Sequence, residues 1–373
     1  MLRKLLIYFV AGPLYLFDAC LAKGRRAIRR ISIGFLDKFL PQIEVNDTIL
    51  GPSVATLASK IIGEYSTRVL DIGARWGSEK VWWRVSPIAA LTGFDPDPSE
   101  CETLNAKVEN KNTEKYVPLA LGSENRRVEI YLTRQPACSS IYEPDTALIS
   151  RYPVLKEIEA LKTSSVAVTP LDQWWEQERK PEVSFIKIDT QGYELEVLKG
   201  STKTLEACLG LEVEVEFSQL YRNQPVFNQV DAYLREKGFV LWSLQDFCKY
   251  QEHDGTRSYT NRVIRFNGKE PKGAGGRLFW ANAIYFRDYN ELIIQPTNQR
   301  RFLLYASFFD ALGDFSASST CLESAIKCAP EKIPTDIKLL IEKKIHTFRG
   351  DFTTELSAPL SWYPNLAFRT SNL

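Results

Sequence analysis

The chain has 373 residues, of which 44% are hydrophobic and 25% are charged, the balance of an ordinary globular protein with room for more than one domain. Its 47 basic and 46 acidic residues leave a net charge of +1, so charge gives no reason to expect a nucleic-acid partner. The seven cysteines form no Cys-x-x-Cys pair and fit reduced thiols in the cytoplasm, and the two histidines exclude a histidine-rich metal site.

The N-terminal segment, residues 1–48, is apolar and basic. Residues 5–22 are mostly apolar, but a Gly-Pro pair and Asp18 interrupt them, and a membrane-spanning helix needs about 20 apolar residues in a row. A basic block follows where a signal peptide would place small residues for cleavage. We therefore expect a cytoplasmic protein in which residues 1–30 either contact a membrane surface or pack on the rest of the chain.

Residues 49–290 alternate between strand and helix patterns. Apolar runs of strand length occur at residues 67–73, 89–97, 114–122, 126–133, 164–169, 184–189, 209–217, 239–245 and 277–287. A helix pattern over residues 52–65 precedes these runs, and further helix patterns separate most of them. Such alternation predicts an α/β fold, a Rossmann-like, doubly wound and mostly parallel sheet with helices on both faces.

The chain changes character after residue 290. A helix, a Leu-Gly turn and a second helix ending at Pro330 predict a helical C-terminal extension over residues 291–373, packed on the main domain. The alternative is a single tetratricopeptide-like hairpin. Residues 250–276 form a polar, glycine-rich insertion in which we expect His253 to be an exposed loop residue. The predicted parts are therefore an N-terminal segment, a domain over residues 49–290 and this extension.

The first candidate site is the stretch VLDIGARWG, in which a strand ends at Asp71 and Gly73 and Gly77 follow. A glycine directly after a strand lets the backbone approach a ligand closely. The glycines that would cradle a pyrophosphate are missing, which argues against a nicotinamide-dependent dehydrogenase. An acid before the glycine turn suits a positively charged ligand such as S-adenosylmethionine, and the alternative is an ordinary strand-to-helix turn.

Asp95, at the end of the next strand in LTGFDPDP, is the second candidate. It follows Asp71 at close to the spacing of about 20 residues at which an acid accepts hydrogen bonds from ribose hydroxyls in doubly wound folds. Together with the glycine turn, this acid favours an adenosine-containing cofactor. Asp97, in contrast, is expected to be a loop acid.

The third candidate is SFIKID, residues 184–189, where a strand that reads as buried ends in Lys187 and Asp189. Residues two apart in a strand share a face, so these two side chains point the same way. The next strand, LEVEVEF, places glutamates on one face, where buried carboxylates must be paired or functional. Glu216 lies nearest the carboxyl end, where open parallel sheets bind ligands. Lys187 has two candidate ion-pair partners, Asp189 and Glu214.

These motifs occur in the order found in the FkbM-type methyltransferase family, which the chain resembles over residues 65–288. The matching stretches are VLDIGARWG, GFDPDP, VPLALGSENRRVEIYL, VAVTPLDQWW, VSFIKIDTQGYELEVLKGS, LEVEVEF and LFWANAIYFR. Within them, IKIDTQGYELEVLKG resembles the family signature KID-x-EG-x-E-x-x-L-x-G. The resemblance implies a Rossmann-like fold of the class I methyltransferase type, S-adenosylmethionine as cofactor, and O-methylation of a small-molecule or glycan acceptor, often a sugar.

Carried over by position, the resemblance implies roles for individual residues. The residues implied to hold the cofactor are Asp71, Gly73 and Gly77 at its methionine end, Asp95 at the ribose, and Ala120 and Leu121 near the adenine. The residues implied to line the acceptor side are Asp189, Gly192 and Glu216. Our candidate catalytic base is Asp189, followed by Glu216, with Lys187 as an ion-pair partner. No metal ligands are predicted.

Two departures from the family pattern favour an alternative, a catalytically inactive protein that keeps the fold for binding or as a scaffold. Arg75 stands after Gly-Ala where the family often has asparagine, and a cation beside a cationic cofactor is unfavourable unless it turns outward or pairs with an acid. Gln191 replaces the glutamate of the signature. The retained acids and glycines of the cofactor motifs favour the enzyme, because an inactive protein has no need of them.

Overall fold

The structure is a computed structural model of the chain. It describes residues 52–78, 82, 84–179, 181–252, 257–259, 276–289 and 298–349. The predicted N-terminal segment lies outside the described residues, as do His253 and most of the glycine-rich insertion. Within the described ranges, none of the helices is both long enough and apolar enough to cross a membrane.

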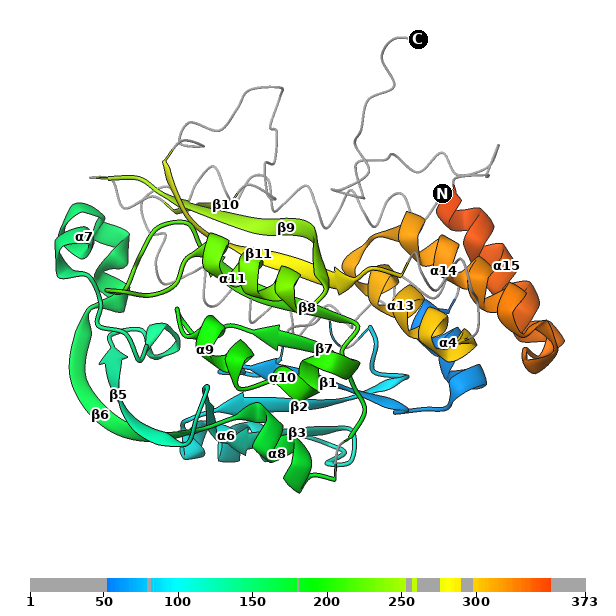
Figure 1. Cartoon of the computed structure of the whole chain (residues 1–373), viewed down its shortest axis with the longest axis horizontal. Coiled ribbons are helices and arrows are strands. Elements are labelled where there is room, and N and C mark those ends of the chain that lie inside the picture. The colour runs from blue at the N-terminus through cyan, green and yellow to red at the C-terminus, as the bar shows by residue number, and fades with distance from the viewer. Residues whose placement is uncertain are drawn as a thin grey trace, which may run out of the picture. The chain divides into compact units, whose positions relative to one another are not determined.

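An eight-stranded sheet forms the centre of the described chain (Figure 1). In spatial order its strands are β10 (Arg257–Tyr259), β9 (Phe239–Tyr250), β11 (Arg277–Arg287), β8 (Gly210–Glu216), β7 (Val183–Ile188), β1 (Thr67–Ile72), β2 (Ala89–Asp95) and β3 (Glu114–Pro118). Strands β3, β2, β1, β7 and β8 pair in parallel, whereas β11 runs antiparallel to both β8 and β9.

The strand order confirms the predicted Rossmann-like, mostly parallel sheet. If β10 is left out and the other seven strands of this sheet are numbered 1 to 7 in chain order, from β1 as 1 to β11 as 7, then their spatial order starting at β3 is 3-2-1-4-5-7-6. This is the doubly wound order 3-2-1-4-5-6 with an antiparallel last strand inserted between the fifth and sixth. The chain reverses direction along the sheet between β1 and β7, and ligands of such folds bind at the carboxyl ends of the strands that flank this switch point.

Helices cover both faces of the sheet, as the alternation predicted. One face packs against α8 (Leu171–Gln177), α9 (Glu194–Lys199), α10 (Thr202–Ala207) and α11 (Phe227–Glu236). The other packs against α4 (Val54–Ile62), α6 (Pro98–Asn105), α13 (Gln299–Leu312), α14 (Phe315–Cys328) and α15 (Thr335–Arg349). Side chains along β7 alternate between the two faces. Phe185 lies in the core shared with α4, α6, α13, α14 and α15, whereas Ile186 and Ile188 lie in the core shared with α8, α9, α10 and α11.

The C-terminal helices share a core with the sheet. Figure 1 shows α13, α14 and α15 side by side, in orange and red. The ring of Phe185 lies 5.1 Å from that of Phe308 in α13 and 4.7 Å from that of Trp82, between centroids. The described residues, from Pro52 to Arg349, belong to one compact unit. The domain boundary predicted at residue 290 falls outside the described residues and stays a prediction.

A second, three-stranded sheet departs from the predicted strands. Its order is β4 (Ala120–Leu121), β6 (Ala160–Thr169) and β5 (Arg126–Thr133). The single strand predicted over residues 114–122 breaks after Pro118, which has no N–H to donate, and the chain then joins β6. Strand β6 also begins earlier than predicted, because it pairs with β5 along its whole length. The remaining elements are η1 (Pro136–Cys138), α7 (Thr146–Arg151), η2 (Pro153–Ile158) and η4 (Pro330–Lys332).

Replacing Phe308 with alanine tests whether the C-terminal helices stabilise the sheet. Phe308 is fully buried and stacks on Phe185, so Phe308→Ala should lower the free energy of unfolding by about 3–5 kcal/mol in urea titrations. Leu339, which is 62% exposed on α15, serves as the control, and Leu339→Ala should change the same quantity by less than about 0.5 kcal/mol. Equal, small losses in both variants would contradict this packing.

Candidate active site

The acids singled out in the sequence gather at the carboxyl ends of neighbouring parallel strands. Asp71 is in β1, Asp95 ends β2, Asp189 follows β7 and Glu216 ends β8. A cavity of about 570 Å³ opens at this edge. Of the predicted site residues, those that line the cavity are Gly73, Asp95, Ala120, Leu121 and Asp189. Those that lie outside its lining are Asp71, Gly77, Lys187, Gly192 and Glu216.

Gly73 allows the ends of β1 and β7 to come together. Its φ is +89°, and a Cβ built on it would lie 1.8 Å from the carbonyl oxygen of Asp189. Its N–H donates to the carbonyl of Phe94 at 2.9 Å, which ties the turn to β2 as well. Gly77 has a similar φ of +90°, but a Cβ there would make ordinary contacts of 3.5 Å. Of the two glycines in this turn, therefore, Gly73 is the one at which backbone contact excludes a side chain.

Lys187 bridges the acids on β1 and β7. Its Nζ lies 3.4 Å from Oδ1 of Asp71 and 3.6 Å from Oδ2 of Asp189. The sequence analysis gave Asp189 and Glu214 as possible ion-pair partners of Lys187, and the structure shows the ion pair with Asp189. Asp71 is buried, and its Oδ1 accepts no hydrogen bond despite the nearby ammonium. The distance of 3.4 Å gives an ion pair without a short hydrogen bond, so this oxygen keeps an acceptor site.

Arg75 pairs with the acids that follow β2. Its guanidinium lies 2.8 Å from Oδ2 of Asp97 and 3.6 Å from Oδ1 of Asp95. Asp97 is more than a loop acid, since it caps α6 by accepting from the N–H of Ser99 at 3.1 Å. Burial raises the pKa of Asp95, and the N–H of Asp97 and the charge of Arg75 oppose this effect. Arg75 thus meets the condition under which a cation is tolerated here, because it pairs with acids.

Gln191 connects the cavity to the acids of β8. Its Nε2 donates at 2.8 Å to Oδ1 of Asp189 and at 2.8 Å to Oε2 of Glu214, and its Oε1 accepts from the hydroxyl of Tyr221. Its φ is +56°, an uncommon value for a residue other than glycine. Such strain persists where surrounding contacts fix the conformation, and it gathers at functional sites. Gln191 therefore orients Asp189, a role that the sequence analysis did not assign to it.

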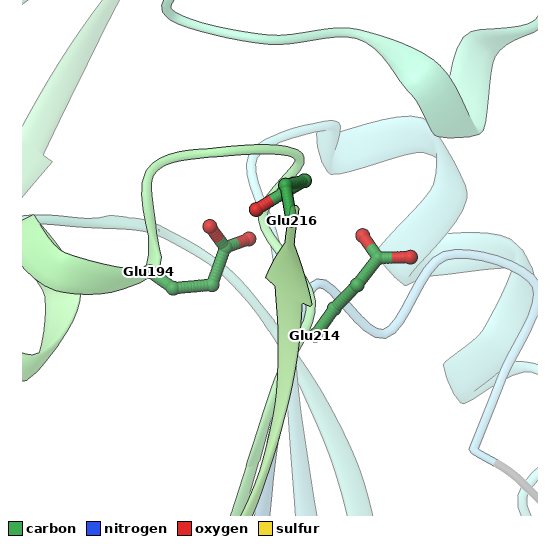
Figure 2. A group of neighbouring side chains, drawn as sticks. All are labelled: Glu194, Glu214 and Glu216. Carbon is green, nitrogen blue, oxygen red and sulfur yellow. The ribbon is translucent and has the colours of Figure 1, made fainter. Parts of the chain in front are cut away.

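Glu194 is a candidate residue that the sequence analysis missed. It begins α9, and its carboxylate lies near those of Glu214 and Glu216 (Figure 2). The available signal was the second glutamate of the family signature, which aligns with this position. Burial, together with the charge of Asp189, raises the pKa of Glu194 to about 7, although backbone N–H groups that donate to it oppose the rise. All three glutamates are buried, so their charges need compensation within the protein.

The walls of the cavity are largely apolar. Strands β5 and β6 contribute Ile130, Leu132, Leu161 and Val166. Tyr193 lies beside them, and its hydroxyl accepts from Nη2 of Arg126 at 2.9 Å. The cavity thus combines acids at the carboxyl edge of the sheet with an apolar wall from the second sheet. This is the usual composition of a small-molecule site, mostly apolar with a few placed polar groups.

Comparison with known families agrees with this geometry. Residues 71–241 match the methyltransferase FkbM domain, which confirms the family resemblance. A characterised relative, the 2-O-methyltransferase NoeI of Sinorhizobium fredii, is 22% identical over 160 residues. That alignment covers 42% of this chain and 66% of the relative, so the chain spans slightly less than two thirds of the relative's length.

Distant solved structures superpose on the chain. A TehB-like, S-adenosylmethionine-dependent methyltransferase from Corynebacterium glutamicum is 10% identical, with a TM-score of 0.28 over 70% of this chain and 100% of that one. The 1,6-didemethyltoxoflavin-N1-methyltransferase of Burkholderia thailandensis, with S-adenosylhomocysteine bound, is 10% identical, with a TM-score of 0.25 over 70% of this chain and 88% of that one. The fold assignment rests on the strand order and not on these distant superpositions.

Replacing Gly73 tests the close approach of β1 and β7. Gly73→Ala should lower the free energy of unfolding by about 2–5 kcal/mol, because it adds a backbone clash to an unfavourable φ. Gly63 is a control with a φ of +90°, a ψ of 153° and no atom within 4 Å of the added Cβ, so Gly63→Ala should cost only the backbone strain of about 1–3 kcal/mol. Equal losses in chemical denaturation would show that φ alone matters at Gly73.

Proposed function

Because residues 71–241 form a methyltransferase FkbM domain, whose methyl donor is S-adenosylmethionine, we propose that this protein methylates a hydroxyl group of a sugar, a glycan or another glycosylated small molecule. The observation that carries the proposal is Asp189, a carboxylate that lines the cavity at the switch point of the sheet. The relative named as a 2-O-methyltransferase supports oxygen as the acceptor atom.

The residues at the cavity suit S-adenosylmethionine. Asp71 lies just outside the cavity lining, immediately before Ile72 and Gly73, which line it. Its buried Oδ1 pairs with Lys187 and has no hydrogen-bond partner, and we assign it to the ammonium of the methionine end. Asp95 would accept from the ribose hydroxyls, and the apolar Ala120 and Leu121 would contact the adenine. The volume of about 570 Å³ lies within the range of about 300–1,000 Å³ for small-molecule sites. The cofactor supplies a methyl carbon that is activated by its bond to a positively charged sulfur.

Arg75 does not close the predicted ribose site. Its short contact is with Asp97 at 2.8 Å, whereas its distance of 3.6 Å to Asp95 is too long for a hydrogen bond. Asp95 can therefore accept from ribose hydroxyls while Arg75 stays bonded to Asp97. The pair with Asp97 also directs the positive charge of Arg75 to a carboxylate, which reduces its repulsion of a cationic cofactor.

Asp189 is the residue that we assign as the catalytic base. Its side chain is 33% exposed, and it lines the cavity, whereas Glu216 is buried outside the lining. Asp189 takes the proton of the acceptor hydroxyl while the new bond from oxygen to the methyl carbon forms, and the electron pair of the broken carbon–sulfur bond stays on sulfur. A base of this kind helps because a sugar hydroxyl is a weak nucleophile.

The groups around Asp189 hold it ready for this step. Lys187 and Gln191 contact different oxygens, Oδ2 and Oδ1 respectively, and so fix the plane of the carboxylate. The N–H of Asp189 donates to the carbonyl of Ile72 at 2.9 Å, which anchors its backbone to β1. Methyl transfer is an in-line displacement, so alignment of the hydroxyl with the methyl carbon is the larger part of what the protein contributes.

Replacing Asp189 tests the proposed chemistry. With S-adenosylmethionine and a panel of free sugars, oligosaccharides and glycolipids, wild type should release S-adenosylhomocysteine together with an O-methylated acceptor. Asp189→Asn should lower kcat by about 10²–10⁴-fold and leave donor affinity, measured by calorimetry, unchanged. Glu102, exposed on α6, gives the control Glu102→Gln, with wild-type kcat.

Three results would each contradict a part of this proposal. A wild-type kcat in Asp189→Asn would remove Asp189 as the base. Failure of wild type to bind S-adenosylmethionine at all would favour the inactive scaffold protein, the alternative that Arg75 and Gln191 raised. Methylation of nitrogen in place of oxygen would keep the fold and the donor but refute the acceptor class.

A further inference from the structure

Three buried glutamates converge at the junction of β8 and α9. Glu214 and Glu216 belong to β8 and Glu194 begins α9, so residues from two elements form the cluster. One carboxylate oxygen of each can be chosen so that all three lie within 4.8 Å of one another. Figure 2 shows the carboxylates of Glu194 and Glu216 turned toward each other. The three residues are each 8% exposed or less.

Two of the three carboxylates, those of Glu194 and Glu214, each accept hydrogen bonds from uncharged donors at one of their two oxygens. Oε1 of Glu194 accepts from the N–H of Thr190 at 2.7 Å and from the N–H of Gly192 at 3.1 Å. Oε2 of Glu214 accepts from Nε2 of Gln191 at 2.8 Å. Neutral N–H groups fix the direction of a carboxylate but do not cancel its charge. The arrangement resembles the outer partners of metal-binding carboxylates, which hold one oxygen and leave the other for the metal.

Gln224 provides an observation that is independent of the acids. It is only 1% exposed, and its Oε1 accepts from the N–H of Tyr221 at 2.5 Å, which fixes the orientation of the amide. Its Nε2 has no hydrogen-bond partner and lies 3.2 Å from the Cβ position of Gly192, at the turn that holds Glu194. Burial raises the pKa of Glu216, and the nearby amide of Gln224 opposes this rise. The buried Nε2 of Gln224 thus lies beside Glu216 but makes no hydrogen bond of ordinary distance and angle, which is unusual for a buried donor and indicates that the site as it stands is incomplete.

We propose that Glu194, Glu214 and Glu216 bind one divalent cation, with Mg²⁺, Mn²⁺ and Ca²⁺ as the candidate ions. Carboxylate oxygens are the ligands that these hard cations prefer. Two ligand atoms on one cation can lie at most about twice a metal–oxygen bond of about 2.1–2.4 Å apart, and one oxygen from each of the three glutamates satisfies that limit. Water molecules would complete the coordination, and Gln224 would hold the carboxylate of Glu216.

The cation would position the base. It would tie the carboxyl end of β8 to the start of α9, which directly follows the turn that carries Gln191. Gln191 bonds both Glu214 and Asp189, so a fixed Glu214 fixes the carboxylate that we assign to proton transfer. The cation itself is separate from the methyl transfer. Its binding can be measured without donor or acceptor, so the failure of either proposal is distinguishable from the failure of the other.

A titration with Mn²⁺ tests this site directly. The full chain is treated with a chelator, desalted and titrated with Mn²⁺, and free Mn²⁺ is followed by electron paramagnetic resonance. Wild type should bind one Mn²⁺ per chain, and Mg²⁺ should compete for it. Glu214→Gln and Glu216→Gln should each weaken binding at least tenfold. Glu196→Gln is the control, because Glu196 is on the same helix as Glu194 but bonds to Lys199 and Ser123. The affinity of this variant for Mn²⁺ should equal that of wild type.

Thermal unfolding separates loss of the site from loss of the fold. Without metal, Glu214→Gln and Glu216→Gln should unfold at or above the wild-type temperature, because each removes a buried acid from a repulsive cluster. Added Mn²⁺ should raise the unfolding temperature of wild type and of Glu196→Gln, but not of the other two. Wild type that binds no Mn²⁺ at millimolar concentration, or a Glu216→Gln variant that binds it equally well, would overturn the proposal. The carboxyl groups would then be neutralised by protons.

Discussion

The buried ion pairs of Lys187 with Asp71 and Asp189 are the interaction on which the rest of the site depends. Two carboxylates share one ammonium here, and removal of Lys187 would leave the buried carboxylate of Asp71 without its ion-pair partner in a low-dielectric interior. The desolvation free energy of these charged groups is spent at the switch point between β1 and β7, where the cavity gives Asp189 access to a ligand. Gly73 makes the arrangement sterically feasible, since it lets the two strand ends approach without a side chain between them.

The surrounding acids divide into groups with different partners. Asp95 and Asp97 share Arg75 on the β2 side of the cavity. Glu194, Glu214 and Glu216 lie on the β8 side, where the hydrogen bonds to Glu194 and Glu214 come from neutral amide and hydroxyl groups. Gln191 joins this side to Asp189, and the replacement of the family's glutamate by glutamine gives the site a donor at this position. A glutamate here would add one more negative charge to an already acidic, buried cluster and could not donate to Asp189 or Glu214 when ionised.

Much of the fold follows from local sequence. The apolar run RLFWANAIYFR predicts a strand at the residues where β11 is found, and the strand-and-helix alternation predicts the parallel sheet. What the pattern does not contain is which strands pair. Pro118 divides an apolar run between two sheets, and β6 extends into polar residues because β5 offers it a partner along its whole length. Pairing between distant segments overrides local propensity in both cases.

The same limit applies to the site. Asp71, Asp95 and Asp189 are predictable because each lies at or beside the end of an apolar strand, and parallel strands bring such ends to one edge. Glu194 could be found only through the family signature, and Gln224 not at all, because both belong to the site only through the way α9 and the loop after β8 fold near the strand ends. Arg75 shows the converse, since its sequence position suggests a conflict with a cationic cofactor that the contact with Asp97 relieves.

The most direct test of this account is a crystal structure of the full chain with S-adenosylhomocysteine. The account predicts that the ribose hydroxyls lie within hydrogen-bond distance of Asp95, that the adenine contacts Ala120 and Leu121, and that the sulfur faces Asp189. Binding of the nucleoside anywhere outside the cavity at the carboxyl edge, or in it with the ribose away from Asp95, would contradict the central claim.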